Sequence, residues 1–333
     1  MAPRVSVIVV NHNAGPHLLR CVESLAAQAM ADFEAIVVDN ESTDGSFAPA
    51  RDRVVGDTRF TFVASGRNLG FAAGNNAAAT RARAPWIATL NPDAFARPDW
   101  LERLLAAAER YPNANMFGST QVDAADPNRL DGCGDAYFAC GIPWRGGYGH
   151  SLGTEPDDYE TFGPCAAAAL YKAADFRALG GFDESYFCYG EDGDLAFRMR
   201  LAGGHCIQVR GAVVEHIGGG SGGGRAFALY HGTRNLVWTF AKNMPAPLLW
   251  PMIGPHLGVL ALLCIKSALR GAAGTTLRAM RDAMIGLGPV LAARRRIQAA
   301  RRVNAGAIAR ALCWNPTTYL RRAPHPIGPA RRP

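Results

Sequence analysis

Acidic side chains are almost absent from the last third of this chain of 333 residues. Residues 225–333 carry 17 lysine and arginine side chains but only one acid, Asp282. Residues 1–224 carry 27 acids and 18 basic side chains, so the formal net charge of +7 combines a part of charge −9 with a part of charge +16. This split argues against a soluble enzyme with one uniform surface. It predicts an acidic body over 1–224 and a basic region over 225–333.

Lysine and closely spaced cysteines are also scarce. Only Lys172, Lys242 and Lys266 are lysine, so arginine supplies nearly all the positive charge. The eight cysteines include no Cys-x-x-Cys pair, which argues against a structural zinc site. The first apolar run, 5–10, is too short for a signal-peptide core, and a disulfide framework is not expected without secretion. We therefore expect the body to stay in the cytoplasm.

The first 110 residues alternate apolar runs with helix-like spacing, which is typical of a parallel α/β sheet. Buried strands are predicted at 5–10, 35–38, 60–64 and 86–90. Helices are predicted at 16–29, 72–82 and 100–110. In open parallel sheets, ligands bind at the carboxyl ends of the strands, so the residues that follow these strands are candidates for a nucleotide site.

Polar side chains close these predicted strands. Asp39 and Asp93 follow the second and fourth strands, and Asn11, Asn68 and Asn91 lie at or near strand ends. A carboxylate there can accept hydrogen bonds from a base or ribose, or hold a divalent cation that bridges phosphates. The alternative is turn formation, because Asp and Asn commonly end strands in Asx turns. The presence of all five residues favours a ligand site.

Five carboxylates crowd into twelve residues around a glycine-containing loop: Asp183, Glu184, Glu191, Asp192 and Asp194. Mutual repulsion makes such crowding unfavourable unless a cation or a proton-transfer role accommodates it. An acid at the mouth of a cleft can act as a general base toward a hydroxyl nucleophile. Asp192 and Asp194 can also cap the helix predicted to begin near Asp192, and capping does not exclude catalysis.

His216 ends a predicted strand directly before the glycine-rich run 218–224. A single histidine is more often an ordinary buried or surface side chain, but this position makes it a candidate metal ligand. The glycine run lacks the Lys-Ser/Thr ending of a phosphate-binding P-loop and does not match the dinucleotide fingerprint. We interpret it as a hinge or lid and as the boundary between the two parts of the chain.

The basic region combines arginine with apolar residues. Residues 248–265 carry no formal charge but contain two prolines, so they are a marginal candidate for a spanning helix of about 20 apolar residues. Residues 266–311 mix arginine with Leu, Ile, Met and Ala, which is the composition of an amphipathic helix lying on an anionic membrane. A nucleic-acid-binding arm is the alternative, and the regular apolar spacing argues against it. We expect peripheral association with the inner face of the cell membrane and no nucleic-acid partner.

Taken in order, these motifs resemble those of inverting glycosyltransferases of family 2, and of rhamnosyltransferase-like members in particular. The resemblance spans about residues 4–220 and is carried by the blocks 5–13, 37–46, 68–76, 90–93 and 181–195. In the basic region, 230–235 and the following apolar stretch resemble the tail of bacterial rhamnosyltransferases.

This resemblance implies a GT-A fold, which is a Rossmann-like nucleotide-binding mixed sheet flanked by helices, with a C-terminal helical, membrane-associating extension. It implies a nucleotide-diphospho-sugar donor, a divalent cation (Mg²⁺ or Mn²⁺) and a hydroxyl acceptor on a glycan or lipid-linked glycan. Asp192 matches the catalytic base and Asp39 the acid that contacts the base or ribose. Asp93 and His216 match the metal site.

Two further groups of residues are expected at the site. The nucleotide group comprises Asn11, Asn40 and Asn68, and the acceptor-loop group comprises Asp183, Glu184 and Glu191. The metal motif departs from the family's Asp-x-Asp because it reads Asn91-Pro92-Asp93, which leaves one carboxylate there. By resemblance alone, the first expectation for the donor is thymidine-diphospho-L-rhamnose, with a UDP-sugar as the other candidate.

Two functions of other classes remain as alternatives. A nucleotidyltransferase that makes nucleotide-sugars would share the first strand-helix-strand unit, but it would need a basic loop to hold a triphosphate. Residues 11–16 contain no Lys or Arg. A catalytically silent protein that binds sugar or membrane is the second alternative, and the full set of acids argues against it.

Overall fold

A mixed β-sheet forms the centre of the computed structural model, which describes residues 2–218 and 223–329. The strands lie in the spatial order β13-β10-β12-β6-β11-β4-β1-β2-β3, with β5 beside β12 and β7 beside β6, while β8 and β9 form a separate hairpin. Their bounds are β1 (Val5–Asn11), β2 (Phe33–Asp39), β3 (Phe60–Ala64), β4 (Trp86–Leu90), β5 (Ala94–Ala96), β6 (Met116–Asp123), β7 (Leu130–Gly132), β8 (Asp135–Phe138), β9 (Ile142–Arg145), β10 (Tyr159–Thr161), β11 (Ala168–Lys172), β12 (Cys206–His216) and β13 (Gly328–Pro329).

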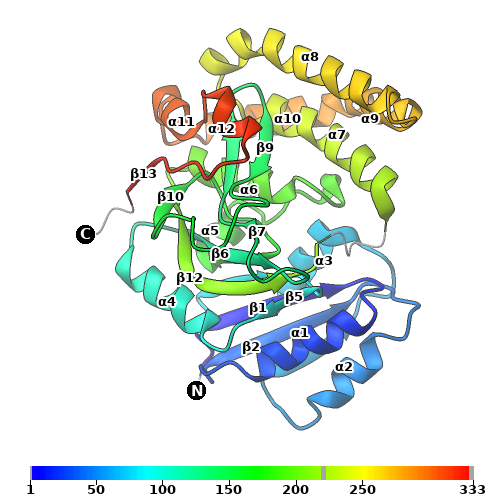
Figure 1. Cartoon of the computed structure of the whole chain (residues 1–333), viewed down its shortest axis with the longest axis vertical. Coiled ribbons are helices and arrows are strands. Elements are labelled where there is room, and N and C mark those ends of the chain that lie inside the picture. The colour runs from blue at the N-terminus through cyan, green and yellow to red at the C-terminus, as the bar shows by residue number, and fades with distance from the viewer. Residues whose placement is uncertain (1, 219–222, 330–333) are drawn as a thin grey trace.

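Helices cover both faces of this sheet and cap one end of the molecule (Figure 1). The helices of the sheet layers are α1 (Pro16–Ala26), α2 (Phe47–Arg53), α3 (Gly70–Ala79), α4 (Trp100–Arg110), α5 (Ala173–Ala178), α6 (Glu191–Leu201) and the 3₁₀ turn η1 (Glu184–Tyr186). The later helices are α7 (Gly224–Asn243), α8 (Ala246–Ala268), α9 (Ala273–Ile285), α10 (Leu287–Ala299), α11 (Ala305–Ala311) and α12 (Pro316–Leu320).

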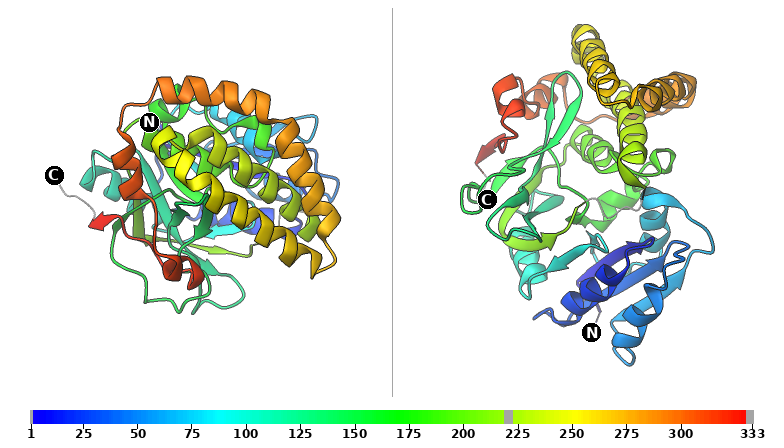
Figure 2. Two further views of the ribbon diagram at one scale, coloured as in Figure 1. Left: turned by 90° about the horizontal axis from the view of Figure 1, so that it is seen from above. Right: turned by 45° about the vertical axis from the view of Figure 1, so that its right-hand side comes forward.

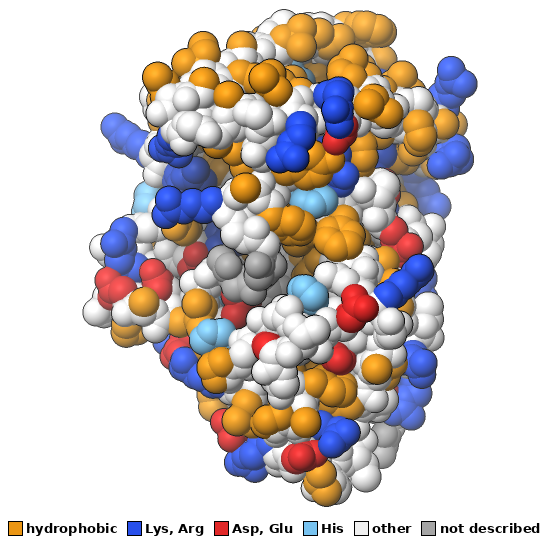
Figure 3. Space-filling view, turned by 90° about the vertical axis from the view of Figure 1, so that its right-hand side faces the viewer, with side chains coloured by type: hydrophobic (Ala, Val, Ile, Leu, Met, Phe, Trp, Pro, Cys, Tyr) orange, Lys and Arg blue, Asp and Glu red, His pale blue; other side chains and the backbone are white. Residues whose placement is uncertain are grey.

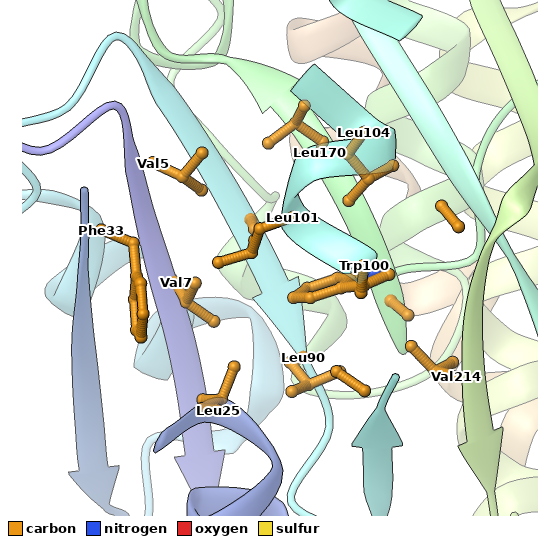
Figure 4. Packing of buried hydrophobic residues seen from close by; sticks show 14 of the residues in the cluster. Val5, Val7, Leu25, Phe33, Leu90, Trp100, Leu101, Leu104, Leu170 and Val214 are labelled. Carbon is orange, nitrogen blue, oxygen red and sulfur yellow. The ribbon is translucent and has the colours of Figure 1, made fainter. Parts of the chain in front are cut away.

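Strand β1 shows why the sheet has two hydrophobic cores. Every residue of β1 is buried, as expected for a parallel strand covered on both faces. Val5, Val7 and Val9 point into a core shared with α1, α2 and α4, and Figure 4 shows part of it around Trp100. Ile8 and Val10 point into the opposite core, which α3, α5 and α6 cover. The alternation follows from the two-residue period of a strand.

The strands predicted at 5–10, 35–38, 60–64 and 86–90 are confirmed as β1 to β4, and the helix predicted at 100–110 is α4. Helix α2 is not predicted, because its seven residues are too few to show a helical period and include Pro49. The strand predicted to end at His216 is confirmed as β12, which shifts register against β6 between Val209 and Val213. A bulge of this kind breaks the alternation without ending the strand.

Helices α7 to α10 form the cap (Figures 1 and 2). Helix α8 is long and apolar enough to cross a membrane by length and composition, with a mean hydropathy of 1.9 over an 18-residue window of which 6% is buried. Large exposed side chains on α8 and α9 include Trp250, Leu257, Leu262, Ile265 and Leu277. Figure 3 shows hydrophobic side chains gathered over this end of the molecule. The predicted amphipathic stretch 266–311 is divided among several helices, with turns at Gly271 and Gly286.

The C-terminal segment returns from the cap to the sheet. Strand β13 pairs with β10, and Cys313 bridges to Phe138 of the hairpin. Phe240 and Leu312 belong to the same hydrophobic core as Ile8 of β1. The predicted boundary at 224/225 coincides with the start of α7, but hydrophobic packing crosses it.

Lys242 of α7 is a buried cation that forms ion pairs with residues of the body. Its side chain is 2% exposed, and its ammonium pairs with Asp183 and with Asp194, the latter at 2.7 Å. It also lies 4.6 Å from the ring centre of Tyr186. Asp194 Oδ2 also accepts a hydrogen bond from Arg198 Nε at 2.8 Å. Burial alone would raise the pKa of Asp194, but the Arg198 and Lys242 cations lower it to about 2.

We expect Lys242→Ala to lower the free energy of unfolding by about 3 kcal/mol, because Asp183 loses its cation and the buried Asp194 keeps only Arg198. Urea denaturation measures this change. The matched control is Lys266→Ala, since Lys266 is exposed and its loss should change stability by less than about 0.5 kcal/mol. Similar midpoints for the two variants would show that the buried pairing does not hold the cap.

Candidate active site

The strand order changes direction at β1, which lies between β2 and β4 and is parallel to both. Asn11 and Asp39 sit side by side in the register of β1 and β2, at the carboxyl ends of the strands. A crevice is expected at such a switch point, because the connections leave the strand ends in opposite directions. Two adjoining cavities occupy this edge of the sheet, and residues 91 and 93 line both.

The first cavity has a volume of about 240 Å³. Its polar wall is a network of His12, Asn40 and Asn68. The Asn40 amide donates to Asn68 Oδ1 at 3.0 Å, and its own oxygen accepts from the Leu69 backbone at 2.8 Å. The two ring nitrogens of His12 lie 2.9 Å from the Asn40 carbonyl and 3.2 Å from the Asn68 amide nitrogen. Phe71 and Phe227 supply apolar wall, so the cavity combines hydrogen-bonding groups with faces against which a ring can pack.

Two predicted nucleotide residues lie beside this wall. Asn11 is fully buried, and its amide donates to Ser42 at 2.9 Å and Ser46 at 3.0 Å, so it holds the loop after β2. Asp39 is partly buried and accepts from the Ser42 backbone at 3.2 Å. Among the five residues Asn11, Asp39, Asn40, Asn68 and Asp93, the last three line the cavity directly.

The predicted hinge or lid falls largely on 219–222, which lie outside the described residues. The glycine that follows them, Gly223, lines the first cavity together with Phe227 from the first turns of α7.

The second cavity has a volume of about 410 Å³ and brings together residues from distant parts of the sequence. Its polar lining includes Asp93, Asp135, Arg145, Asp192, His216 and Arg322. The predicted base and the predicted metal ligands therefore share one cavity, although 99 positions separate Asp93 from Asp192.

His216 is held between two carboxylates. Its Nδ1 lies 2.7 Å from Asp131 Oδ2, and its Nε2 lies 3.4 Å from Asp93 Oδ1. Arg145 in turn pairs with Asp131. Burial alone would lower the pKa of His216, but its bonds to Asp131 and Asp93 raise it above the ordinary value. The Asp131 contact fixes the ring so that Nε2 faces Asp93, the arrangement usual for metal-binding histidines.

Asp192 lies in the first turn of α6 and lines the second cavity. Its Oδ2 accepts from the Ala166 backbone at 3.3 Å, and its Oδ1 accepts from Gly193 at 2.7 Å. Burial raises its pKa above the ordinary value, while the two backbone donors and Arg145 act in the opposite direction. A carboxylate whose pKa is moved toward neutrality is suited to accept a proton.

Asp135, Cys165 and Asp192 have ligand atoms within 4.8 Å of one another. Burial raises the pKa of Cys165 to about 12, and burial with the charge of Asp192 raises that of Asp135 well above its usual range. Because Mg²⁺ and Mn²⁺ favour carboxylate over thiol ligands, the Cys165 thiol makes this trio a poorer site for such a cation than Asp93 with His216.

Glu191 also lines the second cavity, next to the proposed base. It is buried, its Oε2 has no hydrogen-bond partner within the described residues, and burial with the neighbouring Asp192 raises its pKa to about 8. The raised pKa favours the neutral form of Glu191, which reduces its repulsion of the neighbouring Asp192 carboxylate.

The other predicted acids are engaged in local structure. Asp183 caps η1 by accepting from the Ser185 backbone at 3.0 Å and pairs with Lys242. Glu184 accepts from Asn76 at 3.0 Å. Both lie on a pocket away from the two cavities, between η1 and α10.

Sequence reasoning missed several residues of the site: His12, Asp131, Asp135, Arg145 and Arg322. His12 follows Asn11 at the end of the first strand, and this position is the signal that can identify it. The others come from β7 to β9 and from the C-terminal segment, where weak periodicity gives no signal that they meet at the cavity.

Residues 6–180 match the family described as Glycosyl transferase family 2. The N-acetylglucosaminyl-diphospho-decaprenol L-rhamnosyltransferase of Mycobacterium tuberculosis is 28% identical over 298 residues, which cover 81% of this chain and 95% of that protein. The succinoglycan biosynthesis protein ExoO of Rhizobium meliloti is 36% identical over 130 residues, which cover 39% of this chain and 35% of that protein.

Solved structures share the fold at lower identity. The mannosyltransferase PcManGT from Pyrobaculum calidifontis, in complex with GDP-Man and Mn²⁺, matches with a TM-score of 0.55 and 20% identity over 93% of this chain and 87% of its own. GalNAc-T7, with UDP, GalNAc and Mn²⁺, matches with a TM-score of 0.54 and 16% identity over 64% and 42% of the two chains. The chain therefore belongs to glycosyl transferase family 2, has the GT-A fold and is a glycosyltransferase.

Proposed function

We propose that this enzyme transfers L-rhamnose, with inversion, from thymidine-diphospho-rhamnose to a hydroxyl of a lipid-linked glycan in cell-surface polysaccharide synthesis. One observation carries the proposed chemistry: the Asp192 carboxylate lines the same cavity as Asp93 and His216, directly beside the first cavity. The rhamnosyltransferase relative, whose length this chain nearly covers, supports the choice of sugar over a UDP-sugar donor.

In this proposal the first cavity holds the nucleotide. Asn40 and Asn68 present amide groups to it, and Asp39 at the adjoining strand end reaches the base or ribose. Asp93 stands where the two cavities meet, so the donor diphosphate lies between them with the sugar facing the second cavity.

Asp93 and His216 provide an oxygen and a nitrogen ligand, a set that Mn²⁺ and Mg²⁺ accept when phosphate oxygens complete it. When bound there, the cation neutralises the charge that develops on the leaving diphosphate. Asp131 keeps His216 in its ligating orientation.

Asp192 acts as the general base. It removes the proton of the acceptor hydroxyl as that oxygen attacks the anomeric carbon and the bond from this carbon to the diphosphate breaks. A single displacement inverts the anomeric carbon, so one base suffices and no covalent nucleophile is needed. The backbone donors from Ala166 and Gly193 hold the carboxylate in place for this task.

The exposed apolar face of α8 and α9 supports peripheral binding to the inner face of the membrane. Arginine residues 270, 278 and 281 lie in or beside these helices and would contact anionic headgroups. A lipid-linked acceptor would then reach the enzyme at the surface to which the cap binds.

Asp192→Asn should lower sugar transfer by about 10²–10⁴-fold, because the amide has nearly the same shape but cannot take the proton. Binding of thymidine diphosphate with Mn²⁺, measured by calorimetry, should stay nearly unchanged. Transfer is measured as release of nucleoside diphosphate from thymidine-diphospho-rhamnose and from UDP-sugars in parallel. The matched control is Asp157→Asn, whose side chain is 94% exposed. Retention of most turnover in the Asp192 variant would remove it as the base.

Asp131→Asn should weaken Mn²⁺ binding by about 10–100-fold, because His216 loses the carboxylate that fixes its ring. Electron paramagnetic resonance of free Mn²⁺, titrated in the presence of thymidine diphosphate, measures the affinity without any turnover. Asp157→Asn again serves as the control. Equal affinities in the two variants would exclude Asp131 from support of the metal site.

Replacing Leu257, Leu262 and Ile265 together by Glu should reduce recovery of the full-length protein with floating phosphatidylglycerol vesicles. These side chains are 58%, 67% and 57% exposed, so the change should leave folding intact while it charges the apolar face. Val55→Glu, at a 78% exposed position distant from the cap in sequence, is the control. Equal recovery of all three proteins would contradict membrane binding through α8.

A further inference from the structure

The second cavity contains a cation that the proposed mechanism does not use. Arg322 lines this cavity from the C-terminal segment. Arg322 is exposed, its guanidinium lies 5.8 Å from the ring centre of Tyr148, and none of the ion pairs among the described residues includes it. Arg145, the other arginine of the cavity, is already paired with Asp131. Arg322 is therefore the cation of this cavity that is available to a ligand.

The backbone around Arg322 is fixed on three sides. The carbonyls of three successive residues, 321 to 323, accept from His150 at 2.8 Å, from the Gly147 backbone at 2.7 Å and from Trp144 Nε1 at 3.1 Å. All three donors belong to β9 or to the turn that follows it. The segment is thus attached to the wall of the cavity, and Arg322 is presented from a fixed backbone.

Arg322 adopts a φ of +50°, directly after the end of α12. Glycine or asparagine usually occupies this left-handed position at a helix end, because the Cβ atom of another residue is crowded there. The contacts of the neighbouring carbonyls hold the strained conformation. Strained residues that the surrounding structure holds in place cluster at active sites and ligand-binding segments.

The position of Arg322 separates it from the donor. It lines the second cavity, with Asp192, and is not part of the lining of the first cavity, where the nucleotide would lie. A neutral sugar gives no reason to place an unpaired guanidinium there, whereas a phosphate group is a strong partner for one.

We propose that Arg322 binds a phosphate group carried by the acceptor, so that the enzyme selects acceptors whose sugar is linked through phosphate or diphosphate. This inference rests on the proposed function, because it takes the second cavity as the acceptor site. The C-terminal segment then acts as a specificity element, delivered to the site by its attachment to β9.

The test measures binding of three probes by calorimetry without donor and with EDTA, which prevents diphosphate binding through a metal. The probes are an alkyl N-acetylglucosaminyl diphosphate, N-acetylglucosamine 1-phosphate and the corresponding neutral alkyl glycoside. The native enzyme should bind the alkyl diphosphate at least tenfold more tightly than the neutral glycoside. The free sugar phosphate shows whether the lipid-linked form is required, since comparable binding of it would assign the site to soluble phosphorylated acceptors.

Arg322→Gln should remove most of the preference for phosphate, and Arg322→Lys should keep part of it. The matched control is Arg321→Gln, because Arg321 is exposed as Arg322 is but does not line the second cavity, and its backbone carbonyl, which holds the segment, is unchanged. No preference in the native enzyme, or a preference that survives in Arg322→Gln, would overturn the proposal.

Binding of thymidine diphosphate with Mn²⁺, measured on the same proteins, separates this result from the proposed function. It should be unchanged in Arg322→Gln. A loss there equal to the loss for the acceptor probe would assign Arg322 to the donor and overturn the proposal, whereas failure of the native enzyme to bind nucleotide would count against the proposed donor site alone.

Discussion

Parallel pairing of β1 with both β2 and β4 is the constraint on which the rest of the site depends. It places the ends of three strands at one edge of the sheet, and the connections that leave them diverge. His12, Asn40 and Asp93 line the crevice between them, although these residues lie far apart in the sequence. The strands are apolar along their length and polar at their ends, so the same pattern that buries them also positions the site.

Charged side chains have different roles in different parts of the molecule. In the body, Asp93 and Asp192 line the second cavity, and Asp131 holds the ring of His216 there. Between body and cap, Asp194 and Lys242 form a buried pairing that is structural. On the cap, arginine lies beside exposed apolar side chains, and acids are nearly missing from the sequence there. The contrast in net charge between the two halves of the chain thus corresponds to a cavity lined by acids in the body and to an apolar surface with arginine beside it on the cap.

The sequence predicted several residues that line the second cavity, but not the residues that contact them. Asp93, Asp192 and His216 stand in local motifs at strand or helix ends, where residue type and position together suggest a role. Asp131 and Arg145 give no such signal, because β7 and β9 are only three and four residues long and acquire their places from pairing with other segments. Closeness to Asp192 in the sequence predicts that Asp183 and Glu184 belong to the same site. In the structure, η1 places both residues at a different pocket.

By itself, the sequence determined the fold class, the first four strands, the family and the acids at the strand ends, because periodicity and local motifs are properties of neighbouring residues. Tertiary structure alone decided which residues share a cavity. It places Asp131 in contact with His216, and it places Arg322, which is near residue 333, in the lining of the cavity that contains Asp192. It also buried Lys242 between two carboxylates. Contacts between residues so distant in the chain follow from strand pairing and packing, and a local pattern does not encode them.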